Sequence, residues 1–116
     1  MAVFQYSSTK HGGVTVIHIG GSLDAETSPK FDSKIKGEID KGARKIVCNM
    51  AHLDYIASAG LGVLIAANDI LSKQGGEIRL SAMNEKIKKI FKLLGFIRLF
   101  KLFESDQKAI DSFKGL

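Results

Sequence analysis

The sequence contains few of the residues that cross-link, kink or disorder a chain. Among 116 residues there is one proline and one cysteine, and there is no tryptophan. The single cysteine, Cys48, excludes an intramolecular disulfide and fits a reducing compartment. The hydrophobic share of 45% and the charged share of 25% exclude a disordered chain. We expect residues 1–116 to fold as one domain.

Targeting and membrane-spanning patterns are also missing. The opening residues, MAVFQYSSTKHGG, contain no basic segment followed by a long apolar run. No stretch reaches the roughly 18 apolar residues that a membrane span needs. These absences predict a cytoplasmic protein without a membrane span.

Clustered metal ligands and paired acid–base groups are missing as well. His11, His18 and His52 are scattered, with no i, i+4 pair and no neighbouring cysteine, so the sequence predicts no metal site. No Gly-x-Ser-x-Gly or P-loop pattern occurs near the most prominent loop. We therefore expect no cofactor, and an enzyme is the least favoured class of function.

What the sequence does contain is regular hydrophobic periodicity. Extended runs over 3–8 and 14–21 flank two glycines and predict an antiparallel hairpin. An amphipathic helix follows, with Thr27 or Ser28 as its cap, Pro29 in its first turn and Gly42 at its end. The pattern then predicts a strand, a helix, a strand, a helix, a strand and a helix, over 44–50, 59–73, 77–83, 84–95, 97–103 and 105–115. This order implies an α/β fold with a mixed sheet.

The junction between the strand 44–50 and the helix from 59 carries an isolated hydroxyl. Ser58 is the only hydroxyl between Tyr55 and Ser72, and sites in such sheets form at the carboxyl ends of parallel strands. One interpretation is an ordinary N-cap, worth about 1 kcal/mol. The other is a site of modification, at which Ser58 is a substrate rather than a catalyst. Gly60 and Gly62 permit close approach of either a partner or the sheet.

Three segments carry a resemblance to a known family: GSLDAETS (21–28), IVCNMAHLDYIASAGLGVL (46–64) and GGEIRLSAMNEKIKKIFKLLGF (75–96). They resemble the signature regions of the bacterial anti-sigma factor antagonists, which are single STAS domains, and the resemblance covers nearly the whole chain. It implies a STAS-like mixed five-stranded sheet, with an N-terminal antiparallel hairpin, parallel crossovers and about four helices.

The same resemblance implies a function. In this family the serine at the position of Ser58 is phosphorylated by a partner that is both an anti-sigma factor and a serine kinase. The implied module is non-enzymatic: it sequesters the kinase, releases a sigma factor, is switched off with the kinase's ATP and is reset by a phosphatase. The implied partner-binding residues are Asp24, Tyr55, Ile56, Ala57, Ser58, Ala59, Gly60, Leu61 and Leu64. We expect a monomer or weak dimer that makes no direct contact with nucleic acid.

Two features depart from the family pattern. Many members have an aspartate directly before the serine, where this chain has Ala57. The net charge of +5 is also more basic than we expect of relatives. The missing aspartate affects how a kinase or phosphatase recognises the loop. The basic net charge affects which partners bind the surface.

The charge excess is local. Residues 84–101 contain six lysines and arginines against Glu85 alone, so this segment accounts for the whole net charge. Either Lys86, Lys89 and Lys92 or Lys88 and Lys92 line a helix face. That face is either a solvated surface or a docking site for nucleic acid, an anionic membrane surface or an acidic partner. No aromatic residue interleaves with the lysines, which argues against stacking on bases.

One alternative keeps the fold without the switch. In that alternative the chain is a STAS scaffold or subunit of a lipid-transport or stress-signalling assembly, and Ser58 only caps its helix.

Overall fold

The two N-terminal strands form the predicted hairpin in the computed structural model, which describes residues 3–114. β1 (Gln5–His11) and β2 (Val14–Leu23) pair antiparallel, with Gln5 opposite Gly20 and His11 opposite Val14. Gly12 in the turn has φ of 62°, a conformation that glycine adopts at little cost.

Helices and strands alternate over the rest of the chain, as predicted. The elements are α1 (Ser28–Asp40), β3 (Lys45–Ile56), α2 (Ser58–Ser72), β4 (Glu77–Ser81), α3 (Glu85–Leu93), β5 (Leu102–Phe103) and α4 (Asp106–Ser112). The sheet order is β1-β2-β3-β4-β5, and every pair after the hairpin is parallel. The predicted mixed five-stranded sheet with four helices is therefore confirmed.

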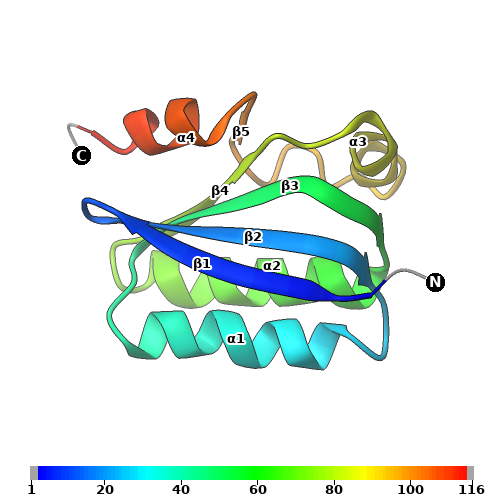
Figure 1. The fold of residues 1–116 in the computed structure, drawn as a ribbon, viewed down its shortest axis with the longest axis horizontal. Helices are drawn as coiled ribbons and strands as arrows, with labels where there is room; N and C mark the ends of the chain where they lie inside the picture. The colour runs from blue at the N-terminus through cyan, green and yellow to red at the C-terminus, as the bar shows by residue number, and fades with distance from the viewer. Residues whose placement is uncertain (1–2, 115–116) are drawn as a thin grey trace.

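The sheet lies between two helical layers. Figure 1 shows α1 and α2 side by side on one face and α3 and α4 on the other. Alternate residues of the central strands supply the two cores, because successive side chains of a strand point to opposite faces. Ile46 and Cys48 belong to the large core, whereas Val47 between them packs with Ile110 and Phe113 of α4. None of the helices within residues 3–114 is both long and apolar enough to span a membrane.

Several helix ends are the predicted ones. Pro29 lies in the first turn of α1, and Gly42, with φ of 106°, follows its end. The Asn84 side chain accepts a hydrogen bond from the Ile87 N–H at 2.9 Å and so caps α3. The Ser105 hydroxyl accepts from the Lys108 N–H at 3.2 Å and caps α4. The predicted helix over 105–115 ends at Ser112, and residue 115 lies outside the described residues.

The structure corrects the predicted side-chain cap of α1. Thr27 occupies the N-cap position, but its side chain makes no cap hydrogen bond. Its hydroxyl instead donates to the Ser22 carbonyl at 2.7 Å and accepts from the Asp24 N–H at 2.9 Å. Ser28, the other predicted cap, is buried inside the helix. Thr27 therefore ties the loop before α1 to the end of β2 rather than satisfying the helix.

β3 is longer than the predicted strand over 44–50. It continues to Ile56 because β2 keeps pairing with it, with Leu23 opposite Ile56 at the far end. The ladder is irregular between His18 and Gly20 and again between Gly21 and Ser22. These bulges interrupt the regular alternation of inward and outward side chains, which is the pattern that sequence reasoning uses.

β5 is shorter than the predicted strand over 97–103. Only Leu102 and Phe103 pair with β4, and residues 97–100 form turns. Gly95, with φ of 80°, ends α3 and turns the chain. A further turn is closed by a hydrogen bond from the Leu99 N–H to the Phe96 carbonyl at 3.2 Å. Ile97 and Phe100 therefore anchor a turn against the large core instead of extending the sheet, whereas Leu99 is exposed.

The burial of Cys48 gives a test of this architecture. Cys48 is 0% exposed in the central strand, and burial raises the pKa of its thiol to about 12. A disulfide reagent at about pH 8 should therefore modify the native protein only as fast as the sheet opens, and fast labelling should appear only in denaturant. Rapid labelling of the native protein would contradict the central position of β3.

Candidate functional site

The carboxyl ends of β2 and β3 hold the two residues singled out by the sequence. The Ala57 N–H donates a 2.7 Å hydrogen bond to the Leu23 carbonyl, which closes the parallel pair at its last residues. Asp24 directly follows Leu23, and Ser58 directly follows Ala57. The fold therefore brings them to neighbouring positions at one edge of the sheet, where α1 and α2 begin (Figure 1).

Ser58 is the first residue of α2, not its cap. Ala57 occupies the N-cap position with φ of −91° and ψ of 172°, and α2 has no side-chain cap hydrogen bond. The Ala57 carbonyl accepts from the N–H groups of Gly60 and Leu61 at 3.0 and 3.1 Å. The N-cap interpretation of Ser58 is therefore wrong. Its side chain is exposed at the positive end of the helix, where the first N–H groups have no intrahelical acceptor.

Asp24 is a partly exposed carboxylate that backbone groups hold in place. Its Oδ1 accepts from the N–H groups of Thr27 and Glu26, both at 2.9 Å, and from the Thr27 hydroxyl at 3.2 Å. These hydrogen bonds, led by the one from the Thr27 backbone, lower the pKa of Asp24 below its usual value. Asp24 is thus a fixed negative charge beside the Ser58 loop.

The two glycines of the loop have different roles. A Cβ on Gly60 would lie 2.8 Å from the Leu23 Cβ and 3.0 Å from the Ile56 Cγ1, so Gly60 lets α2 pack against the sheet. A Cβ on Gly62 would meet nothing within 4 Å. The sequence allows these glycines to admit either the sheet or a partner. Gly60 admits the sheet, whereas Gly62 leaves the surface of α2 accessible to a partner.

The implied partner-binding residues fall into a buried group and a group that reaches the surface. Ile56, Leu61 and Leu64 are each no more than 1% exposed and belong to the large core, and Gly60 is also buried. In the free protein these four residues support the loop from below, and their direct contact with a partner stays a prediction. The residues that reach the surface are Asp24, Tyr55, Ala57, Ser58 and Ala59.

A shallow groove beside Ser58 was not anticipated. It measures about 370 Å³ and lies between the first turns of α1 and α2, lined by Ala25, Ser28, Pro29, Asp32, Ala59 and Val63. Ser28 is 2% exposed, and its hydroxyl is buried without a hydrogen-bond partner in the described structure. No sequence pattern signals this groove, because it depends on how closely the two helices pack.

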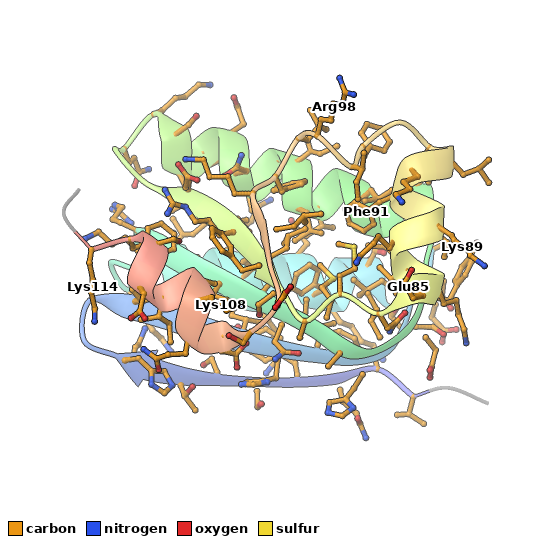
Figure 2. The ribbon with its side chains drawn as sticks, turned by 90° about the horizontal axis from the view of Figure 1, so that it is seen from above. Glu85, Lys89, Phe91, Arg98, Lys108 and Lys114 are labelled. Atoms are coloured by element: carbon orange, nitrogen blue, oxygen red, sulfur yellow. The ribbon has the colours of Figure 1, made fainter. Side chains whose placement is uncertain are left out.

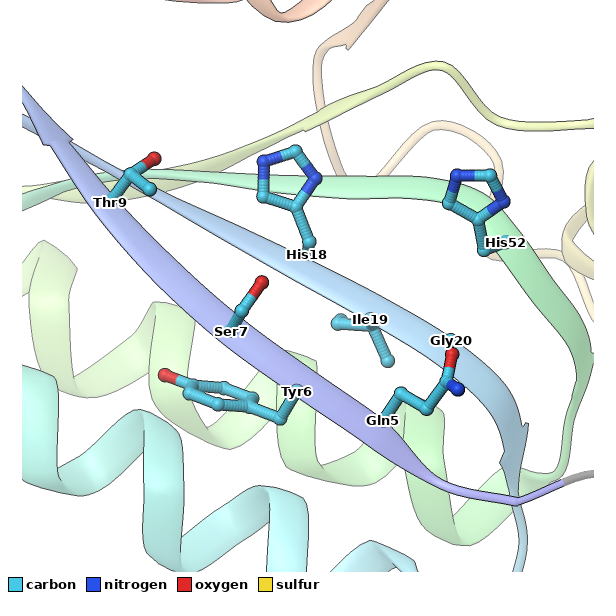
Figure 3. Close-up of a pocket in the computed structure, with 8 residues that line it drawn as sticks. All are labelled: Gln5, Tyr6, Ser7, Thr9, His18, Ile19, Gly20 and His52. Atoms are coloured by element: carbon cyan, nitrogen blue, oxygen red, sulfur yellow. The ribbon is translucent and has the colours of Figure 1, made fainter.

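A second hollow lies on the other face of the hairpin. Figure 3 shows its lining residues on β1, β2 and β3, among them His18 on β2 and His52 on β3, and its volume is about 490 Å³. His18 Nε2 lies 3.8 Å from a carboxylate oxygen of Asp106. Within residues 3–114 no three histidine, cysteine, aspartate or glutamate side chains gather closely enough to hold a metal ion.

Comparison with known proteins finds similarity over nearly the whole chain. A family model described as the STAS domain matches residues 5–109. BtrV of Bordetella bronchiseptica, assigned to the anti-sigma factor antagonists, is 28% identical over 105 residues that cover 90% of each chain. The anti-sigma-B factor antagonist of Bacillus subtilis is 28% identical over 79 residues, which cover 68% of this chain and 72% of that protein.

Solved structures of similar proteins have the same fold. The anti-sigma factor antagonist SpoIIAA in its unphosphorylated form superposes with a TM-score of 0.80 at 24% identity, over 98% of each chain. The phosphorylated form of SpoIIAA from Bacillus superposes with a TM-score of 0.72, over 97% of this chain and 100% of that one. Both pairs share the arrangement of elements described above.

The different roles of the glycines predict stability changes of opposite sign. Gly60→Ala should lower the free energy of unfolding by about 1–3 kcal/mol, because the methyl group overlaps Leu23. Gly62→Ala should raise it by about 0.5–1 kcal/mol, because alanine favours the helix and meets no obstacle. Urea denaturation of both variants checks this, and equal effects would contradict the packing described.

The position of Ser58 predicts that its hydroxyl contributes little to stability. Ser58→Ala should change the free energy of unfolding by less than about 0.5 kcal/mol, since the side chain is exposed and caps nothing. Ser105→Ala is the matched control and should cost about 1 kcal/mol, because Ser105 is a true cap. A larger cost for Ser58→Ala than for the control would restore the N-cap interpretation.

Proposed function

Because this chain belongs to the STAS domain family and is similar over most of its length to anti-sigma factor antagonists, we propose that it acts as one. In this proposal it is a protein-binding module that captures an anti-sigma factor serine kinase and so releases a sigma factor. The kinase, using its own ATP, phosphorylates Ser58 and ends the interaction, and a phosphatase resets the protein. This function is binding and not catalysis, as the sequence predicts.

The observation that carries the proposal is the unengaged Ser58 hydroxyl at the start of α2. It is exposed, takes no part in capping the helix, and has no competing hydroxyl until Ser72. A kinase can therefore reach the hydroxyl without unfolding the loop. The small neighbours Ala57 and Ala59 leave this approach unobstructed.

A phosphate on Ser58 is compatible with the fold. It would carry about −1.5 to −2 charges and three acceptor oxygens at the amino end of a 15-residue helix. Free N–H groups of the first turn and the positive end of the helix dipole favour an anion there. Modification should therefore change the surface while the core beneath it stays packed.

The same phosphate is incompatible with an interface that covers Ser58. A partner that had covered the neutral hydroxyl would have to desolvate a dianion, at a cost of several kcal/mol unless it supplied a new cation. The fixed negative charge of Asp24 adds repulsion. Since about 1.4 kcal/mol changes an affinity tenfold, phosphorylation is sufficient to release the partner.

The surface around Ser58 supports docking of a partner. Tyr55 is 49% exposed and offers a rigid amphipathic side chain, which is typical of interface anchors. On the other side of Ser58, the groove lined by Ala59 and Val63 is large enough for one apolar side chain. We propose that Asp24, Tyr55, Ala57 and Ala59 surround Ser58 in the complex, and that Gly62 allows the partner to approach α2 closely.

The replacement of the family's aspartate by Ala57 affects recognition rather than the acceptor. Without that carboxylate, Asp24 is the acidic residue that directly follows the end of β2, beside the Ser58 loop. The kinase and the phosphatase would therefore read Asp24 as the charge beside the modified residue. In this proposal the loop after β2 contributes to the specificity of the interaction.

Phosphate mapping tests the proposal directly. After incubation with the anti-sigma factor kinase of the same organism and ATP, mass spectrometry should locate one phosphate, on Ser58. Ser58→Ala should bind the kinase but accept no phosphate, and Ser58→Asp should bind at least about tenfold more weakly.

Ser7→Asp is the control for charge alone. It makes the same chemical change at an exposed position of β1, and it should leave binding within about twofold. If the two proteins bind while Ser58 stays unmodified, and Ser58→Ala and Ser58→Asp bind equally, the switch is excluded. The chain would then act as a scaffold or subunit of an assembly.

A further inference from the structure

The outer side of α3 and the turn after it combine unpaired cations with exposed leucines. We propose that this basic-leucine surface docks the protein on an anionic lipid bilayer, without spanning it. The surface consists of Lys86, Lys89, Lys92, Leu93, Arg98 and Leu99. The proposal goes beyond the switch at Ser58 and does not depend on it.

The charges of this surface have no internal partners. Among residues 3–114, the cations Lys86, Lys89, Lys92 and Arg98 lie in none of the ion pairs. Figure 2 shows Lys89 and Arg98 extending away from the body of the protein. Two neighbouring lysines do have partners: Lys88 lies 3.5 Å from Glu85, and Lys101 lies 3.9 Å from Glu77. The unpaired cations therefore face outward and are free for an external anion.

The two leucines of this surface, one at the end of α3 and one in the turn after it, are unusually exposed. Leu93 is 87% exposed and Leu99 is 51% exposed, although both are large apolar residues. The core-facing side of α3 is provided instead by Ile87 and Phe91, which are fully buried. Helical spacing puts Leu93 four residues after Lys89 and seven after Lys86, so it projects among the lysines.

A bilayer interface matches both components at once. Leucine side chains can enter the boundary between headgroups and acyl chains, while lysine ammonium groups stay among anionic headgroups. Nucleic acid offers phosphates but no apolar phase for Leu93. An acidic protein would need a preformed apolar pocket for a side chain that projects this far. A lipid bilayer provides both phosphates and an apolar phase, and it needs no preformed pocket for Leu93. We therefore favour an anionic bilayer as the partner.

Docking through α3 leaves the proposed switch accessible. α3 lies on the opposite side of the sheet from α1 and α2, at whose first turns the Ser58 site is built (Figure 1). Arg98 and Leu99 share a hollow with Asn68 and Ser72, which belong to the last turns of α2 and not to its first turn. The protein could therefore be held at a membrane surface while its Ser58 loop remains open to a protein partner. Failure of the lipid test leaves the Ser58 proposal untouched.

Flotation with lipid vesicles tests the inference. The intact protein should bind phosphatidylcholine vesicles that contain about one-third phosphatidylserine, and it should not bind pure phosphatidylcholine. Because each basic residue near such a surface strengthens binding about fivefold, Lys89→Ala with Lys92→Ala should weaken binding at least about tenfold. Leu93→Gln should weaken it at least about threefold at unchanged melting temperature.

The matched control removes two lysines from another helix. Lys108 and Lys114 each lie in an ion pair at or after α4, and their double alanine variant removes the same net charge with little effect expected. Absence of binding to the anionic vesicles would overturn the inference, as would an equal loss in the control. Tighter binding to RNA or polyglutamate, unaffected by Leu93→Gln, would identify a general polyanion-binding face and would also overturn it.

Discussion

The hydrogen bond from the Ala57 N–H to the Leu23 carbonyl, at 2.7 Å, is the contact on which the proposed site depends. It closes the parallel pairing of β2 and β3 at their last residues and fixes where each chain leaves the sheet. Gly60 makes this closure possible, because any side chain there would overlap Leu23 and Ile56. The same contact puts the carboxylate of Asp24 and the hydroxyl of Ser58 at one edge of the sheet.

A consequence of this arrangement is that the exposed surface around Ser58 is separate from the core. Leu61 and Leu64 are buried directly below the loop, whereas Ser58 and Ala59 are exposed on the first turn of the same helix. The core therefore holds the loop in one conformation, and a charge placed on Ser58 acts on whatever docks there. The proposed switch would therefore change a binding energy and not a fold, which fits a regulator that must be reset and used again.

Much of this architecture could be predicted from the sequence, because hydrophobic spacing and end signals such as Pro29, Asn84 and Gly95 act locally. The extension of β3 could not, since the bulges in its ladder with β2 break the alternation that identifies a strand. The sequence leaves open whether Ser58 caps α2, and the fact that excludes this is the extended backbone of Ala57, which takes the cap position. Spacing also cannot tell which glycine is packed, and the resemblance that implies Leu61 and Leu64 as partner-binding residues does not reveal that both are buried below the loop.

The central claim is that phosphorylation of Ser58 changes partner binding without changing the fold. The most direct test compares phosphorylated and unphosphorylated protein for the dissociation constant with the anti-sigma factor and for the melting temperature. We expect phosphorylation to weaken binding by at least about a hundredfold, equivalent to about 2.8 kcal/mol, while the melting temperature moves by no more than a few degrees. Equal affinities, or a loss of affinity that accompanies unfolding, would contradict the central claim.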